Sequence, residues 1–242
     1  MRVLYQLTSP MDKTIGPQEV ERRRAVLQSY AAPGTEVAVE PTAHGPAAIE
    51  SANDAAIVVP ELLRLAPEAE ARGFDAIIIG CFSDPGIEAL RETRKVAIVG
   101  PGAASFHLAA QLGTRLSLLT PAGRGLGRVA ARLRSLALAP LLASVRGIGL
   151  SVMDLAQQKP GAIDKAIAAA RVAVDEDRAD VLVLGCMSMA FLPGICEDLS
   201  ERVGVPVVNP VTAALKTGEM MVGMKLAHSK AAYPLPKEQV VI

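Results

Sequence analysis

Two cysteines stand in nearly the same local sequence. Residues 75–83 read DAIIIGCFS and residues 180–188 read DVLVLGCMS, so Cys81 and Cys186 each follow an apolar run and a glycine. The third cysteine, Cys196, has no such counterpart, and the apolar helical pattern of residues 192–199 favours core packing for it. The residues that could do chemistry are therefore a matched pair of thiols.

A pair of thiols suits the inversion of a stereocentre that carries an acidic hydrogen. One group removes the proton from one face of the carbon, and the second delivers a proton to the opposite face. Thiols have unperturbed pKa values of about 8.5, so one cysteine can act as thiolate and its partner as thiol near neutral pH. The planar intermediate carries charge on oxygen, and the backbone N–H groups of residues 82–83 and 187–188 are candidates to stabilise it.

A structural interpretation competes with this one. Free cysteine is a common buried side chain, and either thiol taken alone is explained equally well in that way. The shared Asp, Gly, Cys and Ser at matched spacing favour catalysis for the pair. The non-enzyme alternative is a small-molecule binding protein with inert thiols. Thiol titration would separate the two.

Composition excludes several other classes of function. Lys plus Arg and Asp plus Glu both number 25 in the 242 residues, so no basic surface for nucleic acid or anionic lipid is expected. Three cysteines and no CxxC or HxxxH spacing argue against a disulfide framework and a metal site. The uncharged segments 96–114 and 181–196 contain too many glycines, prolines or polar residues to span a bilayer. We expect a cytoplasmic protein with a small-molecule substrate and no membrane partner.

The elements that position the cysteines alternate between strand and helix patterns. Ile163, Ala166, Ile167, Ala170 and Val174 predict one face of a helix, as do Val58, Leu62, Leu65 and Ala69. Pro60 and Pro67 are expected to kink or divide the latter helix. Apolar β-rich runs predict strands at 2–7, 36–40, 75–79, 96–99, 116–119, 142–145, 180–184 and 206–208. This alternation predicts an α/β fold with largely parallel sheets.

The cysteine repeat extends into a doubled architecture. Val99-Gly-Pro101 is matched by Val208-Asn-Pro210, and the strand at 115–121 is similar to that at 2–10. We predict a first domain of residues 1–98 plus 209–242 and a second of 99–208. Each cysteine would lie beyond the carboxyl end of a parallel strand, where ligands bind in α/β sheets. Helices expected to begin after each cysteine, at 84–86 and within 190–202, would favour the thiolate.

The two cysteine segments resemble those of the hydantoin/allantoin racemase group within the aspartate/glutamate racemase superfamily. The resemblance rests on GCFSDPG at 80–86 and LGCMSM at 184–189, supported by GPAAIE at 45–50, VPVV at 205–208 and AALK at 213–216. It implies two pseudo-symmetric Rossmann-like domains with the active site in the cleft between them. It also implies no cofactor, Cys81 and Cys186 as bases for opposite enantiomers, and a homo-oligomer. The implied substrate is a 5-substituted hydantoin or a related ureide.

The chain departs from that group at two places. Members usually have Asn-Pro-Asn-Ser/Thr after the first strand, whereas residues 6–10 read QLTSP, and Met187-Ser188 replaces the usual small residues after the second cysteine. A bulkier, more apolar pocket is one consequence. The candidate substrate-binding residues are Gln6, Thr8, Phe82, Ser83, Thr120, Met187 and Ser188.

Two further enzyme alternatives remain open on the same scaffold. One is racemisation of a free amino acid, and the other is decarboxylation or cis–trans isomerisation. The first cysteine segment is less similar to the motifs of those relatives. The glycine-rich segments at 100–104 and 123–127 lack a complete nucleotide-binding fingerprint and are interpreted as turns.

Overall fold

The computed structural model describes residues 1–122 and 126–237. The chain divides into two compact units, Met1–Gly100 with Ala214–Ile242, and Pro101–Ala213. The turn expected at 123–127 falls mainly outside the described residues. No helix of the described part is long and apolar enough to cross a membrane.

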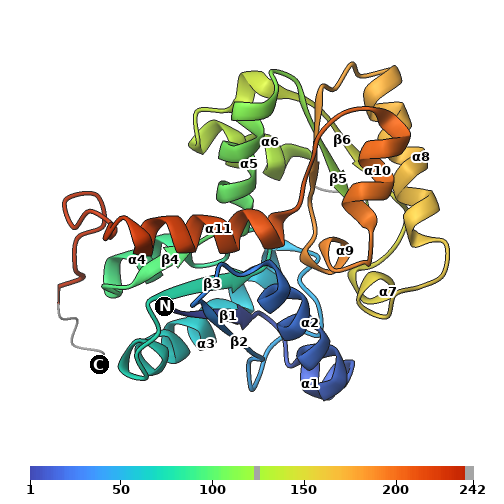
Figure 1. Cartoon of the computed structure of the whole chain (residues 1–242). Helices are drawn as coiled ribbons and strands as arrows, with labels where there is room; N and C mark the ends of the chain where they lie inside the picture. Colours follow the sequence, from blue (N-terminus) through green and yellow to red (C-terminus); the bar gives the residue numbers. More distant parts are fainter. Residues whose placement is uncertain (123–125, 238–242) are drawn as a thin grey trace. The chain divides into compact units, whose positions relative to one another are not determined.

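The first unit is built on a four-stranded parallel sheet of order β2-β1-β3-β4. Its elements in chain order are β1 (Arg2–Leu7), α1 (Met11–Thr14), α2 (Pro17–Tyr30), β2 (Glu36–Glu40), α3 (Ala52–Ala71), β3 (Ala76–Gly80), α4 (Ile87–Thr93) and β4 (Ala97–Val99), with most of α11 (Pro210–Gly223). Figure 1 shows these elements with their labels.

The second unit repeats this topology with the sheet order β6-β5-β7-β8, again all parallel. Its elements are α5 (Pro101–Leu112), β5 (Leu116–Thr120), α6 (Leu126–Ser135), a 3₁₀ turn (Ala139–Leu141), β6 (Leu142–Gly147), α7 (Val152–Ala156), α8 (Ala162–Asp175), β7 (Val181–Leu184), α9 (Met187–Ala190), α10 (Ile195–Val203) and β8 (Val207–Val208). Helices α5 and α6 lie on one face of this sheet, and α8 and α10 on the other (Figure 1).

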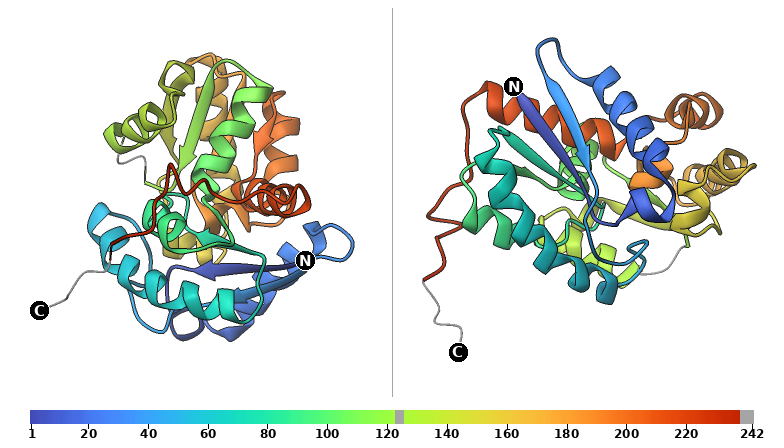
Figure 2. Two further views of the ribbon diagram at one scale, coloured as in Figure 1. Left: turned by 90° about the vertical axis from the view of Figure 1, so that its left-hand side faces the viewer. Right: turned by 90° about the horizontal axis from the view of Figure 1, so that it is seen from below.

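The α/β class with two parallel sheets is thereby confirmed, and all eight strands lie within two residues of their predicted bounds. In the first unit, alternate strand side chains such as Leu4 and Ile77 join the core formed with α3 and α4. On the opposite face, α11 packs so closely that a Cβ on Gly218 would lie 3.6 Å from Ala76 Cβ. Both faces of the sheet are covered, as expected for parallel strands. Figure 2 gives two further views of these layers.

The two helical patterns have different outcomes. Of the kink or division predicted at Pro60 and Pro67, the division does not occur, because α3 runs unbroken from Ala52 to Ala71. Each proline removes one backbone donor, whereas burial of the face that contains Val58 and Leu62 stabilises the whole helix. The predicted face of α8 does pack toward the core: Ala166 and Ala170 are buried, and Ile163, Ile167 and Val174 are partly buried beside the buried Ala162 and Ala173.

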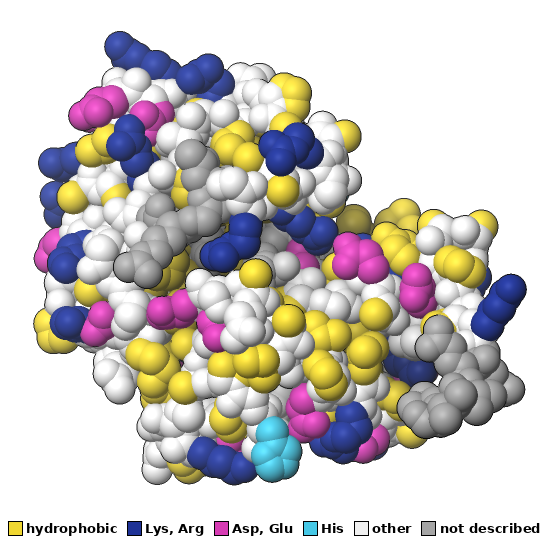
Figure 3. Space-filling view, turned by 180° about the vertical axis from the view of Figure 1, so that it is seen from behind, with side chains coloured by type: hydrophobic (Ala, Val, Ile, Leu, Met, Phe, Trp, Pro, Cys, Tyr) yellow, Lys and Arg dark blue, Asp and Glu magenta, His cyan; other side chains and the backbone are white. Residues whose placement is uncertain are grey.

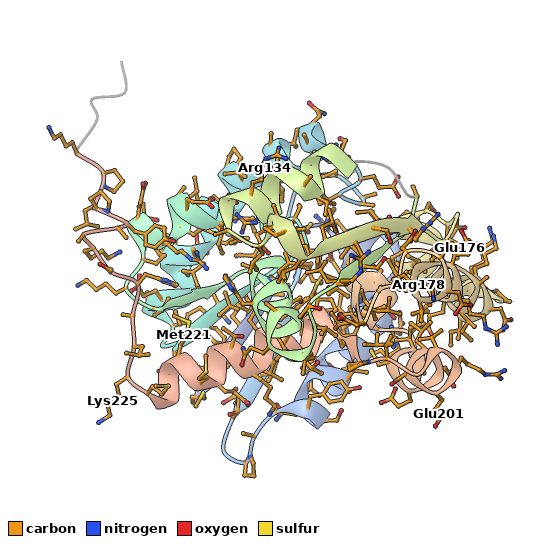
Figure 4. All side chains as sticks on the ribbon, turned by 90° about the horizontal axis from the view of Figure 1, so that it is seen from above. Arg134, Glu176, Arg178, Glu201, Met221 and Lys225 are labelled. Carbon is orange, nitrogen blue, oxygen red and sulfur yellow. The ribbon has the colours of Figure 1, made fainter. Side chains whose placement is uncertain are left out.

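An aspartate ties the beginnings of adjacent strands together in each unit. Asp75 Oδ2 accepts a hydrogen bond from the backbone N–H of Arg2 at 2.7 Å, and Asp180 Oδ1 accepts one from Arg115 at 2.8 Å. The Arg115 side chain also donates to the carbonyl of Arg178, in the turn before β7. Arg178 is labelled in Figure 4. The repeated aspartate is therefore a structural residue at the amino end of the strands.

On the face shown in Figure 3, acidic and basic side chains are interspersed.

Candidate active site

Cys81 and Cys186 occupy the same topological position in their respective units. Cys81 follows β3 directly, and Cys186 follows β7 after one glycine. Each of these strands lies beside the first strand of its unit, with Leu7 paired to Gly80 and Leu119 paired to Leu184. Both thiols therefore lie at the carboxyl edge of a parallel sheet, where α/β proteins bind ligands.

The glycine before each cysteine is required by a close approach of two backbones. A Cβ on Gly80 would lie 2.8 Å from the carbonyl oxygen of Gln6, and a Cβ on Gly185 would lie 2.9 Å from that of Leu119. Real Cβ atoms do not approach backbone so closely. The glycines therefore let the polypeptide turn out of the sheet immediately before the thiol.

The loop of Cys81 is a tight turn. The Cys81 amide donates to Ile79 O at 2.7 Å, and the Asp84 amide donates to Cys81 O at 3.1 Å. The thiol is partly buried, with its Sγ 3.2 Å from Ser83 Oγ. Because α4 begins only at Ile87, Cys81 is not at a helix N-terminus, and the expected helix contribution to its thiolate does not apply.

The loop of Cys186 differs in its local structure. Cys186 is the N-cap residue of α9, a helix of four residues, and its side chain is 7% exposed. The Ala190 amide donates to Cys186 O at 3.1 Å, which closes the single turn. A helix does follow this cysteine, as predicted. The short helix α9 begins directly after it at Met187, and the helix expected within 190–202 is α10, which begins at Ile195.

The other predicted residues of the first unit gather at the same sheet edge. Gln6 is buried, and its amide nitrogen donates to Glu40 O at 2.9 Å and to Leu7 O at 3.2 Å. This amide therefore secures the ends of β1 and β2. Thr8 is buried one residue beyond β1. Phe82 is partly buried and Ser83 is exposed.

In the second unit, Thr120, Met187 and Ser188 are all buried. Thr120 ends β5, and its hydroxyl lies 3.5 Å from Arg146 O, at the limit of a hydrogen bond. Met187 and Ser188 form the first positions of α9. The structure thus groups three of the predicted residues around Cys186 and four around Cys81, each group within one unit.

Two residues near the cysteine loops were missed as functional candidates. Asp84 is 3% exposed and lies against Gly100, the residue after β4. Asn209, after β8, donates from Nδ2 to Ala190 O at 3.1 Å. The repeat offered a signal, because Gly100 and Asn209 are the one unlike pair in the matched segments Val99-Gly-Pro101 and Val208-Asn-Pro210.

Cys196 is unsuited to proton transfer. Burial raises the pKa of its thiol to about 12, and the neighbouring Glu197 carboxylate adds to this effect. The thiol therefore stays protonated at neutral pH. Within the described ranges, no group of three or more His, Cys, Asp or Glu side chains is arranged to hold a metal ion.

Comparison with known proteins places the chain in a family. The family model described as Asp/Glu/Hydantoin racemase matches residues 20–218. A hydantoin racemase from Rhizobium meliloti is 35% identical over 192 residues, which cover 78% of each chain.

Solved structures agree. An allantoin racemase from Klebsiella pneumoniae has a TM-score of 0.89 at 29% identity and covers 100% of this chain and 96% of its own. An allantoin racemase from Pseudomonas fluorescens has a TM-score of 0.87 at 30% identity, with both chains covered completely. The matching repeat of parallel sheets, the matched cysteine loops and these similarities lead to one conclusion: the chain belongs to the Asp/Glu/hydantoin racemase family and is an isomerase of the racemase type.

Proposed function

We propose that this racemase inverts the C5 stereocentre of a 5-substituted hydantoin or a related ureide, with Cys81 and Cys186 as the two acid/base groups and no cofactor. The observation that carries the proposal is the equivalent position of the two thiols. Each follows the strand beside the first strand of its sheet, in sheets of the same order. The proposal requires the two units to present these thiols to opposite faces of one carbon.

The names of the similar proteins support the substrate class. They include hydantoin racemases and allantoin racemases, and allantoin is itself a hydantoin with a ureido group at C5. The hydrogen at C5 of such a ring lies next to a carbonyl and no carboxylate opposes carbanion formation. This carbon acid is therefore stronger than an amino-acid zwitterion, and a thiolate is a base of suitable strength.

In the proposed reaction, the thiolate takes the C5 proton and the negative charge moves to the adjacent carbonyl oxygen. The opposite thiol then donates its proton to the other face of the carbon. The first cysteine ends as thiol and the second as thiolate, so the two exchange roles with each inversion. Backbone N–H groups of residues 82–83 and 187–188 are the candidates to stabilise the oxygen. Gln6, Thr8, Phe82, Ser83, Thr120, Met187 and Ser188 are the proposed substrate-binding residues.

The decisive experiment follows deuterium exchange in single cysteine variants. Cys81→Ser and Cys186→Ser should each lower inversion by about 100- to 10,000-fold, the range for a positioned acid/base group. Each variant should still exchange the C5 hydrogen of one enantiomer without inverting it, and that enantiomer should differ between the two. Cys196→Ser is the matched control and should keep inversion within about twofold of the unmodified protein.

Full racemase activity in either catalytic variant would refute the two-cysteine mechanism. The substrate class is tested separately, by measuring inversion of 5-alkyl hydantoins, allantoin and free amino acids with the unmodified protein. Inversion of free amino acids alone would refute the hydantoin assignment and leave the mechanism standing. Size-exclusion chromatography tests the homo-oligomer that we also propose.

A further inference from the structure

We propose that Asp84 and Asn209 are positioning residues, each of which fixes one cysteine loop against the end of the last strand in its own sheet. This inference rests on the proposed function of the two thiols. It assigns each residue to one half of the reaction, Asp84 to Cys81 and Asn209 to Cys186.

In the first unit, the contact is made by the side chain of Asp84 in the cysteine loop, which reaches Gly100 at the end of β4. The backbone N–H of Asp84 donates to Cys81 O at 3.1 Å, and its side chain is buried against Gly100. A Cβ on Gly100 would lie 2.6 Å from Asp84 Cγ and under 3 Å from both carboxylate oxygens. Only glycine therefore leaves room for the carboxyl group. Asp84 also has a φ of +52°, a left-handed conformation that a non-glycine residue adopts at a cost.

In the second unit, the contact is made by the side chain of Asn209 at the end of β8, which reaches Ala190 in the cysteine loop. The Ala190 amide donates to Cys186 O at 3.1 Å, and the Ala190 carbonyl accepts from Asn209 Nδ2 at the same distance. Asn209 Oδ1 accepts from the Val211 amide at 2.8 Å, so the side chain is held at both ends.

The two links reach one result by different residues. In each case the carbonyl of the cysteine accepts an N–H from the loop residue that is tied to the end of the last strand. The position that matches Asp84 in the second half is Met189, which is fully buried and cannot supply a carboxylate. The position that matches Gly100 is Asn209, which supplies the polar group instead. Because different residues at matched positions make this contact, we infer that both units need a contact between the cysteine loop and the end of the last strand.

The contrast with the strand beginnings sharpens this interpretation. There the same residue, Asp75 or Asp180, makes the same backbone contact in both units and lies far along the strands from the thiols. Those aspartates serve folding. At the carboxyl edge, the links hold the two atoms that must meet a carbon with an accuracy well under 1 Å.

The test uses deuterium exchange with each enantiomer separately. Asp84→Ala should lower kcat by about 100-fold, as expected for a misplaced group, with KM changed less than about threefold. The enantiomer that Cys81 deprotonates should lose exchange and inversion together. The other enantiomer should exchange its C5 hydrogen without inverting, because Cys186 removes and returns the proton. Asn209→Asp keeps the acceptor for the Val211 amide but loses the donor to Ala190 O. In this variant, the enantiomer that Cys186 deprotonates should lose exchange and inversion, and the other enantiomer should still exchange without inverting.

Two controls separate positioning from stability. Asp75→Asn and Asp180→Asn should affect both enantiomers equally, because these residues act at the other end of the strands. Gly100→Ala alone should lower activity severely. The double variant Asp84→Ala/Gly100→Ala should be no less active than Asp84→Ala, since the carboxyl group that clashes with the added Cβ is gone.

The possible outcomes are distinguishable. This inference alone would be overturned if the Asp84 and Asn209 variants affect both enantiomers equally while Cys81→Ser and Cys186→Ser still exchange different enantiomers. The proposed function would be overturned if the two cysteine variants show no such difference between enantiomers. If Asp84→Ala does not fold, the double variant with Gly100→Ala carries the same test.

Discussion

Gly185 lies so close to Leu119 that its backbone N–H donates to the Leu119 carbonyl oxygen at 2.7 Å, and a Cβ would lie 2.9 Å from that same oxygen. This contact brings the chain out of the sheet one residue before Cys186. The corresponding contact of Gly80 does the same before Cys81.

Replacing either glycine by alanine should therefore destabilise the protein and displace the adjacent thiol. For Gly185→Ala we expect the free energy of unfolding to fall by about 1–3 kcal/mol, the usual cost of overpacking, because backbone on both sides must shift. Chemical denaturation measures this loss. Gly127→Ala is the control, because that glycine lies in α6 and an added Cβ would meet nothing within 4 Å outside the neighbouring helix backbone. An unchanged midpoint for Gly185→Ala would contradict the contact.

Asp180→Asn should destabilise the second unit. Although partial burial opposes ionisation, the N–H donors of Arg115 and Thr114 lower the pKa of this carboxyl below its ordinary value. A lowered pKa in the folded state gives stability that is present above the unfolded pKa and is lost as the pH falls through the folded one. We expect a loss of about 1–3 kcal/mol at pH 7 from the weakened hydrogen bonds. The difference between variant and unmodified protein should shrink below about pH 4. A difference independent of pH would refute the explanation.

Alkylation should spare Cys196. Burial raises the pKa of this thiol to about 12, so almost no thiolate is present at pH 8. Iodoacetamide treatment of the folded protein, followed by peptide mass spectrometry, should leave Cys196 unmodified, whereas treatment in denaturant should modify it fully. Rapid labelling of Cys196 in the folded protein would contradict the raised pKa of its thiol.

His228 should make stability depend on pH in a mildly acidic range. Its Nε2 accepts the Ile98 amide at 2.9 Å, and burial, reinforced by the Arg91 guanidinium, lowers the pKa of the imidazole to about 4. The unfolded state then binds the proton first as the pH falls, so stability should decline between about pH 6.5 and pH 4 and level off below. After allowance for partial solvent exposure, the loss should be on the order of 1 kcal/mol.

Glutamine at this position supplies an acceptor that does not titrate. His228→Gln should therefore flatten this part of the pH profile while keeping the contact with Ile98. Thermal unfolding of both proteins from pH 4 to pH 7 checks the expectation. Parallel profiles for the two proteins would show that another group is responsible.

The sequence alone determined the strands, the doubled α/β topology and the pair of thiols. Strand positions depend on local alternation between apolar runs and turn residues, and all eight were within two residues of the observed bounds. Four residue types repeated at matched spacing marked Cys81 and Cys186. The repeat did not reveal which distant segments these residues contact.

Only the tertiary structure showed those contacts. The contact of Asp84 with Gly100 and that of Asn209 with Ala190 join segments that come together only when the third and fourth strands of each sheet pair. Likewise, Gly80 and Gly185 are required by neighbouring strands rather than by their own turns. Local sequence predicts elements because their patterns are short in range. Packing between elements decides the role of each residue, because the atoms that constrain it belong to distant parts of the chain.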